Sequence, residues 1–325
     1  MDEKTHSTIK KADGSAGKFL IGNLCMLIAA IFWGANVSVI KALIPDWMSA
    51  NGVTATRLIG GCILFWIVSL FVKNEKIEKG DWLKIILGGF IGLFGFIYLF
   101  VTSLRFANAI DISIIMTLPP VFVILIGVLF LHRRPSLLEY AGVAVSFVGA
   151  FIVIWGGSCG EAGPNNLLGD LIAVASTICY AFYLIILQGP TKKYHPVNLL
   201  RWVFLFGALP ALFLVPGMEA EGILKSATAV PWIEIGFVLI GPTFLAYFLV
   251  QPADKFIGPE LVSIYQYLIP VFATITAVIL KIDTLKWIQV IAMAVIVVGM
   301  IMTDSGKRKR VKKLVANPSH NNSKQ

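Results

Sequence analysis

The sequence predicts an all-α membrane protein with ten transmembrane helices, arranged as two inverted five-helix repeats around a central cavity. Three observations lead to this fold class: the composition, a series of long apolar segments, and an internal repeat. Of the 325 residues, 57% are hydrophobic and only 14% are charged, and the mean hydropathy is +0.82. Soluble domains rarely reach such values, so the chain requires the apolar surroundings of a lipid bilayer.

Ten apolar segments are each close to the ~20 residues that a helix needs to cross a bilayer. They lie at residues 19–44, 49–72, 82–104, 108–131, 136–155, 168–188, 198–217, 232–250, 256–280 and 285–303. The first is too long for the core of a signal peptide, so we expect it to remain as a helix. The connections are short and leave no room for a separate soluble domain.

The basic residues predict the orientation. Most of the 27 lysines and arginines fall on the same side of the predicted helices as the N-terminus. Because cytoplasmic loops carry an excess of Lys and Arg, we expect both termini on the cytoplasmic side of the cell (inner) membrane. Residues 1–17 are expected to be a disordered cytoplasmic tail, 156–167 an extracytoplasmic loop, and 304–325 a basic cytoplasmic tail. The basic clusters thus serve orientation, and no nucleic-acid partner is expected.

An internal repeat divides the chain. Residues 112–152 align without a gap to residues 262–302, and Pro120 and Pro270 begin the same Pro-Val-Phe sequence in the two copies. Apolar helices match by accident easily, but a Pro-Val-Phe shared at mid-helix and in register is harder to obtain by chance. The alignment therefore indicates a repeating unit of five helices.

The two units are expected at residues 18–155 and 168–303. Since five is odd, the second unit must enter the membrane from the face opposite to the first. Such halves are related by a pseudo-two-fold axis in the membrane plane, which gives secondary transporters two interchangeable gates around a midplane site. The sequence thus predicts transport, and the alternative is a duplicated membrane scaffold with no transport role.

The first segment contains Trp-Gly-Ala-Asn from Trp33 to Asn36, followed by Lys41, and Arg57 lies in the second segment. Together with the two Pro-Val-Phe helices, these residues resemble the EamA-type drug/metabolite transporter superfamily over residues 20–303. The resemblance implies a ten-helix inverted-repeat fold with a central cavity. It also implies export of amino acids or related small metabolites, often coupled to protons.

Neutral polar and aromatic side chains recur at helical spacing on segments from both repeats, which indicates faces turned toward a cavity. The residues expected to bind the substrate are Trp33, Asn36, Tyr98, Tyr183, Tyr247 and Gln266. Their neutral chemistry favours a small polar or amphipathic metabolite, because a nucleotide or sugar phosphate would call for several basic residues. The alternative is hydrogen bonding between helices, which uses the same residue types.

Three charged residues in or near the apolar segments, Lys41, Arg57 and Asp111, are expected to act in gating or charge pairing. Arg57 either snorkels outward, pairs internally or binds a substrate carboxylate. Asp111 is the best carboxylate for a proton-coupling role, and its alternative is a structural pair with Arg105 or Arg57. Lys41 lies near the end of its segment, where a snorkelling interface role is the alternative.

Pro120 and Pro270 lie near the middle of the bilayer and are expected to act as hinges. Proline removes a backbone hydrogen bond and clashes with the carbonyl four residues back, so the carbonyls of Met116 and Gln266 are freed near the midplane. Such groups must face protein or a cavity rather than lipid. The alternative is that the two prolines only kink their helices for packing.

No metal or other cofactor is expected, because the four cysteines lie far apart and no His stands near them to complete a metal site. An intramembrane enzyme is disfavoured, since the sequence lacks the H-E-x-x-H and G-x-S-x-G motifs. The expected partners are a small-molecule substrate, the lipid bilayer and protons. A facilitative carrier that moves its substrate without proton coupling is the nearest alternative function.

Overall fold

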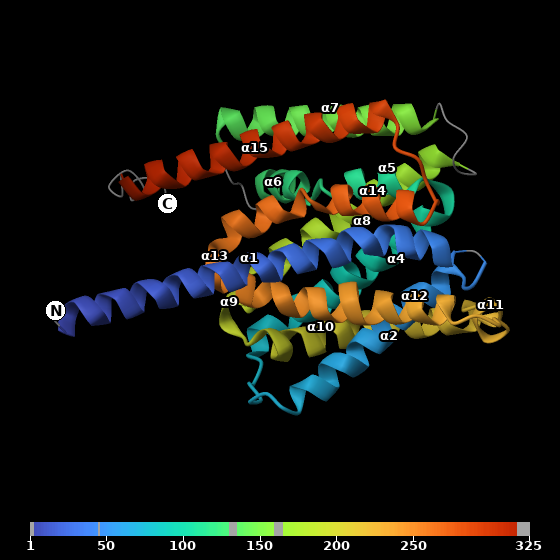
Figure 1. Cartoon of the computed structure of the whole chain (residues 1–325), viewed down its shortest axis with the longest axis horizontal. Helices are drawn as coiled ribbons and strands as arrows, with labels where there is room; N and C mark the ends of the chain where they lie inside the picture. The colour runs from blue at the N-terminus through green and yellow to red at the C-terminus, as the bar shows by residue number, and fades with distance from the viewer. Residues whose placement is uncertain (1–2, 45, 130–134, 159–164, 317–325) are drawn as a thin grey trace.

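The computed structural model describes residues 3–44, 46–129, 135–158 and 165–316, and these parts of the chain form helices with no β-strand among them. The long helices run roughly side by side along one axis (Figure 1). The first half contains α1 (Glu3–Leu43), α2 (Ala50–Ser69), η1 (Lys79–Asp81), α3 (Trp82–Leu87), η2 (Gly88–Phe94), α4 (Gly95–Phe106), α5 (Ala109–Ile115), α6 (Pro119–Leu129) and α7 (Leu137–Ser158). The second half contains α8 (Asn166–Ile186), α9 (Gln188–Lys193), α10 (Pro196–Ala211), η3 (Leu212–Gly217), α11 (Glu221–Leu224), α12 (Val230–Val238), η4 (Leu239–Leu245), α13 (Ala246–Gln266), α14 (Ile269–Ile279) and α15 (Trp287–Ala316).

Nine helices in the described parts of the chain are long and apolar enough to cross a bilayer. This supports the predicted class of helical multi-pass membrane protein, but the count of ten is not reached. The predicted segment 256–280 is divided, because α13 already includes its first part and α14 has only 11 residues. Residues 251–255 are mostly polar and were expected to connect the predicted helices 232–250 and 256–280. Polar residues do not by themselves end a helix, however. The interruption comes instead two residues before Pro270.

The first helix is longer than its apolar part. α1 begins at Glu3, so the structure continues the helix through most of the segment 1–17 that was expected to be disordered. Lysine and alanine in this segment are good helix formers, and extending an existing helix costs far less than nucleating a new one.

Both repeats interrupt one helix at an equivalent place. Residues 116–118 separate α5 from α6, and residues 267–268 separate α13 from α14. Pro120 and Pro270, which we call the hinge prolines, each stand second in the new helix. A proline has no N–H and clashes with the preceding turn, which prevents a continuous helix. The predicted mid-helix kinks are therefore complete breaks, each followed by a helix that starts anew.

The two repeats also share a π-helical turn. The turn η2 spans Gly88–Phe94, and η4 spans Leu239–Leu245 in the second half. In η4, Pro242 cannot donate a backbone hydrogen bond, and the hydroxyl of Thr243 donates to the carbonyl of Val238 at 2.8 Å. Such turns widen a helix locally and recur at functional sites. Their presence in both halves directs attention to the helix faces beside them.

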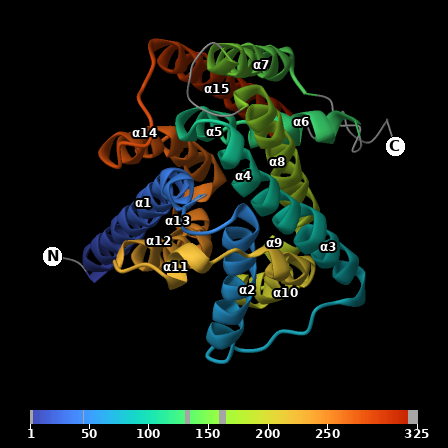
Figure 2. The same ribbon diagram turned by 90° about the vertical axis from the view of Figure 1, so that its right-hand side faces the viewer.

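The helices pack in a layered bundle. α7 and α15 lie side by side at one edge, as Figures 1 and 2 both show. Their close approach depends on glycine, because a Cβ added to Gly299 would lie 2.6 Å from the carbonyl oxygen of Gly142. In the rest of the bundle α1 packs against α13 and α14, α2 against α10, and α4 against α8. These helices enclose the centre of the molecule.

α1 and α8, the first helices of the two halves, run in opposite directions. The ammonium of Lys41 donates to the carbonyls of Leu104 and Ala107 at 2.6 and 2.9 Å, which joins the end of α1 to the end of α4. The backbone N–H of Asn165 donates to the carbonyl of Phe106 at 3.4 Å, so α8 starts at this same place. α1 begins and α15 ends at the other end of the bundle (Figure 1). We call that end the termini end, and the end that holds Lys41 the distal end.

Candidate functional site

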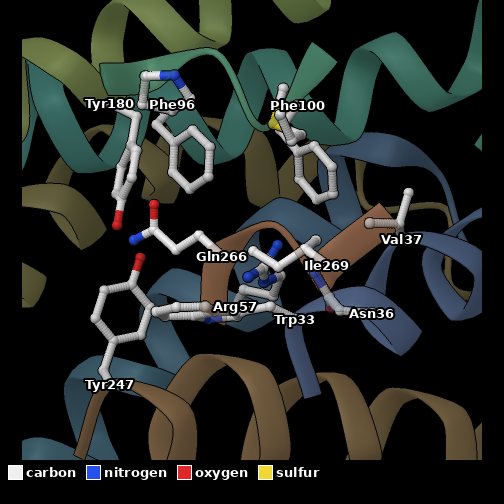
Figure 3. A pocket seen from close by; sticks show the side chains of 12 residues that line it. Trp33, Asn36, Val37, Arg57, Phe96, Phe100, Tyr180, Tyr247, Gln266 and Ile269 are labelled. Carbon is white, nitrogen blue, oxygen red and sulfur yellow. The ribbon is translucent and has the colours of Figure 1, made fainter. Parts of the chain in front are cut away.

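A small cavity lies at the centre of the bundle, where the breaks of both repeats meet α1, α2, α4 and α8. It has about 70 Å³ of space open to the centre of a water molecule. The side chains that line it come from both halves of the chain (Figure 3). They are Trp33, Asn36, Val37, Arg57, Phe96, Phe100, Met116, Pro119, Tyr180, Tyr247, Gln266 and Ile269. We call this space the central cavity.

α1 contributes one face to the central cavity. Trp33, Asn36 and Val37 follow the helical spacing of three and four residues that places side chains on one side. Gly34 allows α14 to approach, since a Cβ there would lie 2.5 Å from the Cβ of Phe272. The indole N–H of Trp33 donates to the carbonyl of Pro242 at 3.3 Å, so the π turn η4 fixes this ring. Asn36 is buried, and its side-chain oxygen has no hydrogen-bond partner.

Arg57 brings a buried positive charge to the central cavity. Its side chain is 3% exposed, and its Nε donates to the hydroxyl of Thr243 at 2.9 Å. The guanidinium carbon lies 5.9 Å from the ring centre of Phe100, within range of a cation–π contact. Its Nη1 has no hydrogen-bond partner, and no carboxylate of the described residues forms an ion pair with it. The predicted internal charge pair is therefore absent from this part of the structure.

Aromatic rings form the wall opposite Arg57. Phe96 packs on Tyr180 at 4.7 Å between ring centres, and Tyr180 stacks in turn on Tyr183 at 5.7 Å. Tyr183 was expected to line the site, but it lies behind Tyr180 rather than on the cavity wall. Helical spacing placed both tyrosines on one side of α8 without showing which one faces inward.

Tyr98 is also absent from the lining of the central cavity. It stacks on Phe94 at 5.6 Å, whereas Phe96 and Phe100 point into the space. Residues two apart on a helix point to nearly opposite sides, so Tyr98 cannot share the face of its neighbours. The spacing of Phe96 and Phe100 was a signal for this face, but two apolar rings gave no reason to choose it over a packing face.

The helix breaks supply the floor of the central cavity. Met116 and Gln266 hold equivalent positions at the two breaks, and both line the space. In Figure 3 the amide of Gln266 lies between the hydroxyl groups of Tyr180 and Tyr247. Tyr247 also meets Trp33 edge to face, with ring centres 6.0 Å apart. Trp33, Asn36, Tyr247 and Gln266 of the six predicted binding residues are thus brought together.

The hinge prolines stand outside the central cavity. Pro270 is buried in packing, and Pro120 lines a second, larger cavity of about 390 Å³ that we call the vestibule. Because neither proline has an N–H, the carbonyls of Met116 and Gln266 receive no bond from the position four residues on. Both carbonyls therefore lack the usual helical hydrogen bond, and both residues line the central cavity.

The vestibule leads from the central cavity to the termini end. Trp33, Tyr180 and Gln266 line both spaces, so they stand at the passage between them. Asp304 and Lys307, in the second half of α15, line the vestibule as well. Cavities of this size accommodate small ligands. The central cavity is therefore approached from the termini end.

Hydrogen bonds that involve two predicted charged residues join the helices at the distal end. Lys41 caps the end of α4, a position where a cation is favoured by the exposed carbonyls. The carboxylate of Asp111 is buried and accepts from the amides of Gln289 at 2.8 Å and Asn108 at 3.3 Å. We call this set of contacts, made by Lys41, Asn108, Asp111 and Gln289, the distal seal. Neither Lys41 nor Asp111 lines the central cavity, and Asp111 pairs with neither arginine that the sequence suggested.

Asp283 completes the distal seal from the loop before α15. It accepts from the backbone N–H of Ile110 at 3.3 Å and of Thr284 at 2.8 Å. Burial raises the pKa of Asp283, although these two N–H groups and the charges of Lys286 and Lys41 oppose the shift. The seal thus gathers carboxylates, amides and lysines between α1, α4, α5 and α15.

Comparison with known proteins identifies the family. Two stretches of the chain, residues 20–155 and 167–303, match the model of the EamA-like transporter family. The chain belongs to this family. The resemblance noted from Trp33, Asn36, Lys41 and Arg57 is thereby confirmed.

This EamA-like protein is similar to several uncharacterized transporters. It is 24% identical over 287 residues to the uncharacterized transporter YyaM of Bacillus subtilis, covering 87% of this chain and 93% of the relative. The uncharacterized inner membrane transporter YicL of Salmonella typhimurium is 23% identical, with 80% of this chain and 87% of the relative covered. A crystal structure of another protein matches with a TM-score of 0.58 and 19% identity, over 88% of this chain and 98% of that chain, which shows a shared fold. Transport is therefore the general function that these findings support.

Proposed function

We propose that this protein is a secondary transporter that exports a small amphipathic metabolite with one carboxylate, such as an amino acid or a related compound, by alternating access. The observation that carries the proposal is Arg57, a buried guanidinium with a free Nη1 and no carboxylate partner among the described residues. It lines a cavity that opens toward one end of the bundle through the vestibule.

The substrate chemistry follows from the side chains of the central cavity. A buried, unpaired guanidinium is costly, and a carboxylate both neutralises it and fills its free donor. The free amide oxygen of Asn36 can accept a hydrogen bond, as an ammonium or amide of the substrate requires. The carbonyls that the hinge prolines leave without a helical donor can do the same. Trp33, Phe96 and Phe100 provide apolar walls for the remaining part. One arginine matches one negative charge, which disfavours nucleotides and sugar phosphates.

Alternating access is supported by features that occur once in each half. The helix breaks at residues 116–118 and 267–268 and the π turns η2 and η4 hold matching places in the two repeats. α1 and α8 run in opposite directions, as an inverted pair requires. Inverted repeats can exchange conformations, so that the open end becomes the closed one. The present structure then represents the conformation open at the termini end and closed at the distal seal.

The direction of transport rests on the orientation. The basic residues favour a cytoplasmic termini end in the inner membrane, so the vestibule would load substrate from the cytoplasm. Export follows if the distal end opens to the outside with substrate bound. A proton gradient is the natural driving force for such export, and no carboxylate of the described residues lines the central cavity. This last observation also favours the second candidate, a facilitative carrier without proton coupling.

The test is uptake into proteoliposomes that contain the purified full chain. The panel holds amino acids, their carboxamides and decarboxylated amines, nucleosides, sugars and sugar phosphates, each with and without a pH gradient. We expect uptake of one or more carboxylates, none of the matching amides, and acceleration by the gradient. Uptake without any response to the gradient would support the facilitative carrier. Transport of amides as fast as acids would refute the role of Arg57.

A further inference from the structure

Another buried charge-bearing residue, Asp170, stands apart from the central cavity. Asp170 lies on α8, near the distal end, and its side chain is fully buried. Neither of its carboxylate oxygens has a hydrogen-bond partner. Asp111, by contrast, has an amide donor on each oxygen. Asp170 and Asp111 therefore differ in whether hydrogen-bond donors stabilise the charged carboxylate.

The elements packed against α8 bring no cation to Asp170. α8 packs against α3, α4, α5, α6, α7, α9 and η2. The lysines of α3 and α9 lie at the opposite end of α8, where Lys84 and Lys193 donate to Asp81. The group on these elements whose charge acts on Asp170 is Asp111 of α5, and it is a like charge. Arg105 of α4 is exposed and lies over the ring of Phe106 instead. Glu139 of α7 lines the vestibule toward the termini end. An ionised Asp170 would thus be buried without a donor, without a counter-ion and beside another carboxylate.

Such an arrangement is stable only if Asp170 holds a proton. A buried carboxylate without donors takes up a proton rather than remain charged, because the neutral acid avoids the loss of hydration. Asp170 is therefore a neutral acid when the distal seal is closed.

The repeat shows what Asp170 meets when the distal end opens. Gly22 of α1 and Gly169 of α8 make matching contacts, since an added Cβ would lie 2.6 Å from the side chain of Ile257 and 2.5 Å from that of Ala107, respectively. Asn23 thus corresponds to Asp170 in the first repeat. In the open termini end Asn23 is partly exposed and accepts a hydrogen bond from the hydroxyl of Tyr265 at 2.8 Å. Exchange of the two conformations would give Asp170 a similar, partly hydrated position.

The position of Asp170 along α8 connects it with the substrate site. Asp170, Thr177 and Tyr180 share one face of the helix, at steps of seven and three residues. Tyr180 lines the central cavity. Ten residues of helix place Asp170 about 15 Å beyond Tyr180 toward the distal end. A cavity that opened at that end would therefore pass the carboxyl group.

We propose that Asp170 is the proton-binding site of this transporter, loaded when the distal end is open and required to be protonated before that end can close. The inference rests on the alternating access proposed above. The proton from the distal side forms an O–H bond with one carboxylate oxygen, and the same bond breaks when water and an open distal end stabilise the charged form. Because closing and protonation favour each other, acid on the distal side promotes the conformation described here.

The first test measures protonation and needs no substrate. Infrared spectra of the purified full chain in lipid at neutral pH should contain the C=O band of a protonated carboxylic acid. The band should be lost in Asp170→Asn and retained, at a shifted frequency, in Asp170→Glu. Asp81 is the matched control, because this buried carboxylate accepts from Lys84, Lys193 and Tyr194 at 3.1, 3.1 and 2.9 Å. Asp81→Asn should leave the acid band in place. Identical acid bands in wild type and Asp170→Asn would overturn the proposal.

The second test measures how acid on the distal side affects transport in proteoliposomes, with a substrate from the panel above. The ratio of uptake with and without a pH gradient should exceed one in the wild type and fall to one in Asp170→Asn. Asp170→Glu and Asp81→Asn should keep a ratio above one. An unchanged ratio in Asp170→Asn would overturn the proton site while leaving transport intact. If no substrate is transported at all, the proposed function fails, and the infrared band still decides the protonation of Asp170.

Discussion

Replacement of Arg57 tests the substrate chemistry most directly. Arg57→Gln keeps a polar side chain that can still donate to Thr243, but it removes the positive charge and the free Nη1. A hydrogen bond to a charged group is worth about 1.5–3 kcal/mol, and about 1.4 kcal/mol changes an equilibrium constant tenfold. Loss of the contact with a carboxylate should therefore weaken binding by roughly 10- to 100-fold.

Arg57→Gln should weaken substrate binding but leave the stability of the folded protein unchanged or raise it. In the free protein the guanidinium is buried with one hydroxyl partner and no counter-ion among the described residues. Removing an unpaired buried charge relieves its desolvation cost. Arg57→Gln should thus melt at the same temperature as the wild type or higher, while substrate raises its melting temperature less than it raises that of the wild type.

The assay compares two ligands in two proteins. Calorimetric titration with the acid and its carboxamide, in wild type and Arg57→Gln, forms a double-mutant cycle. The acid should lose about 10- to 100-fold in affinity on mutation, and the amide should lose almost nothing. Arg201→Gln is the matched control, since Arg201 is also buried but packs on Trp66 and Trp202 away from the cavity. Equal losses for acid and amide would refute a carboxylate contact at Arg57.

Four further predictions follow from the structure. Alanine at either hinge proline should leave membrane insertion intact and slow turnover, and low expression with normal activity per molecule would instead indicate a packing role. Gln266→Leu and Asn36→Leu should change substrate preference in competition assays. If cysteines placed at these two positions could be labelled from neither side of the membrane, a binding site there would be contradicted. Reporters fused after residue 160 and after Lys313 should report opposite sides of the membrane. Gly299→Leu should lower the melting temperature, because overpacking costs about 1–3 kcal/mol, and an unchanged value would mean that α7 and α15 can separate freely.

The sequence predicted the class of fold better than its details, and four of the six residues proposed to bind substrate line the central cavity. Apolar segments and the Pro-Val-Phe repeat indicated the membrane helices and a proline hinge in each repeat, because bilayer thickness and the missing proline N–H act locally. The helix count differed, since a polar stretch at residues 251–255 is compatible with helix in the folded protein. The residue types of a segment do not show whether neighbouring helices pack over it in the folded protein.

The site residues likewise divide into those that local sequence could predict and those that depend on neighbouring helices. Trp33 and Asn36 could be chosen from sequence because they are polar groups deep in one apolar segment. Tyr183 was preferred to Tyr180, and Phe96 was overlooked, because the inward direction on a helix depends on how its neighbours are rotated. Asp170 escaped notice for a related reason. Only the folded structure shows that its oxygens lack a donor while those of Asp111 have two.

The passage between the central cavity and the vestibule has a pharmacological consequence. Trp33, Tyr180 and Gln266 line both spaces, so a transported molecule must fit entirely on the inner side of them before the termini end can close. A longer molecule, with a carboxylate at Arg57 and a tail that reaches Asp304, would hold this passage apart. Such a compound would compete with substrate yet never be carried, and a cationic tail would suit the vestibule, whose lining has two acidic residues, Glu139 and Asp304, and one lysine, Lys307. The two joined cavities thus set the length and the end groups that a non-transported inhibitor of this protein would need.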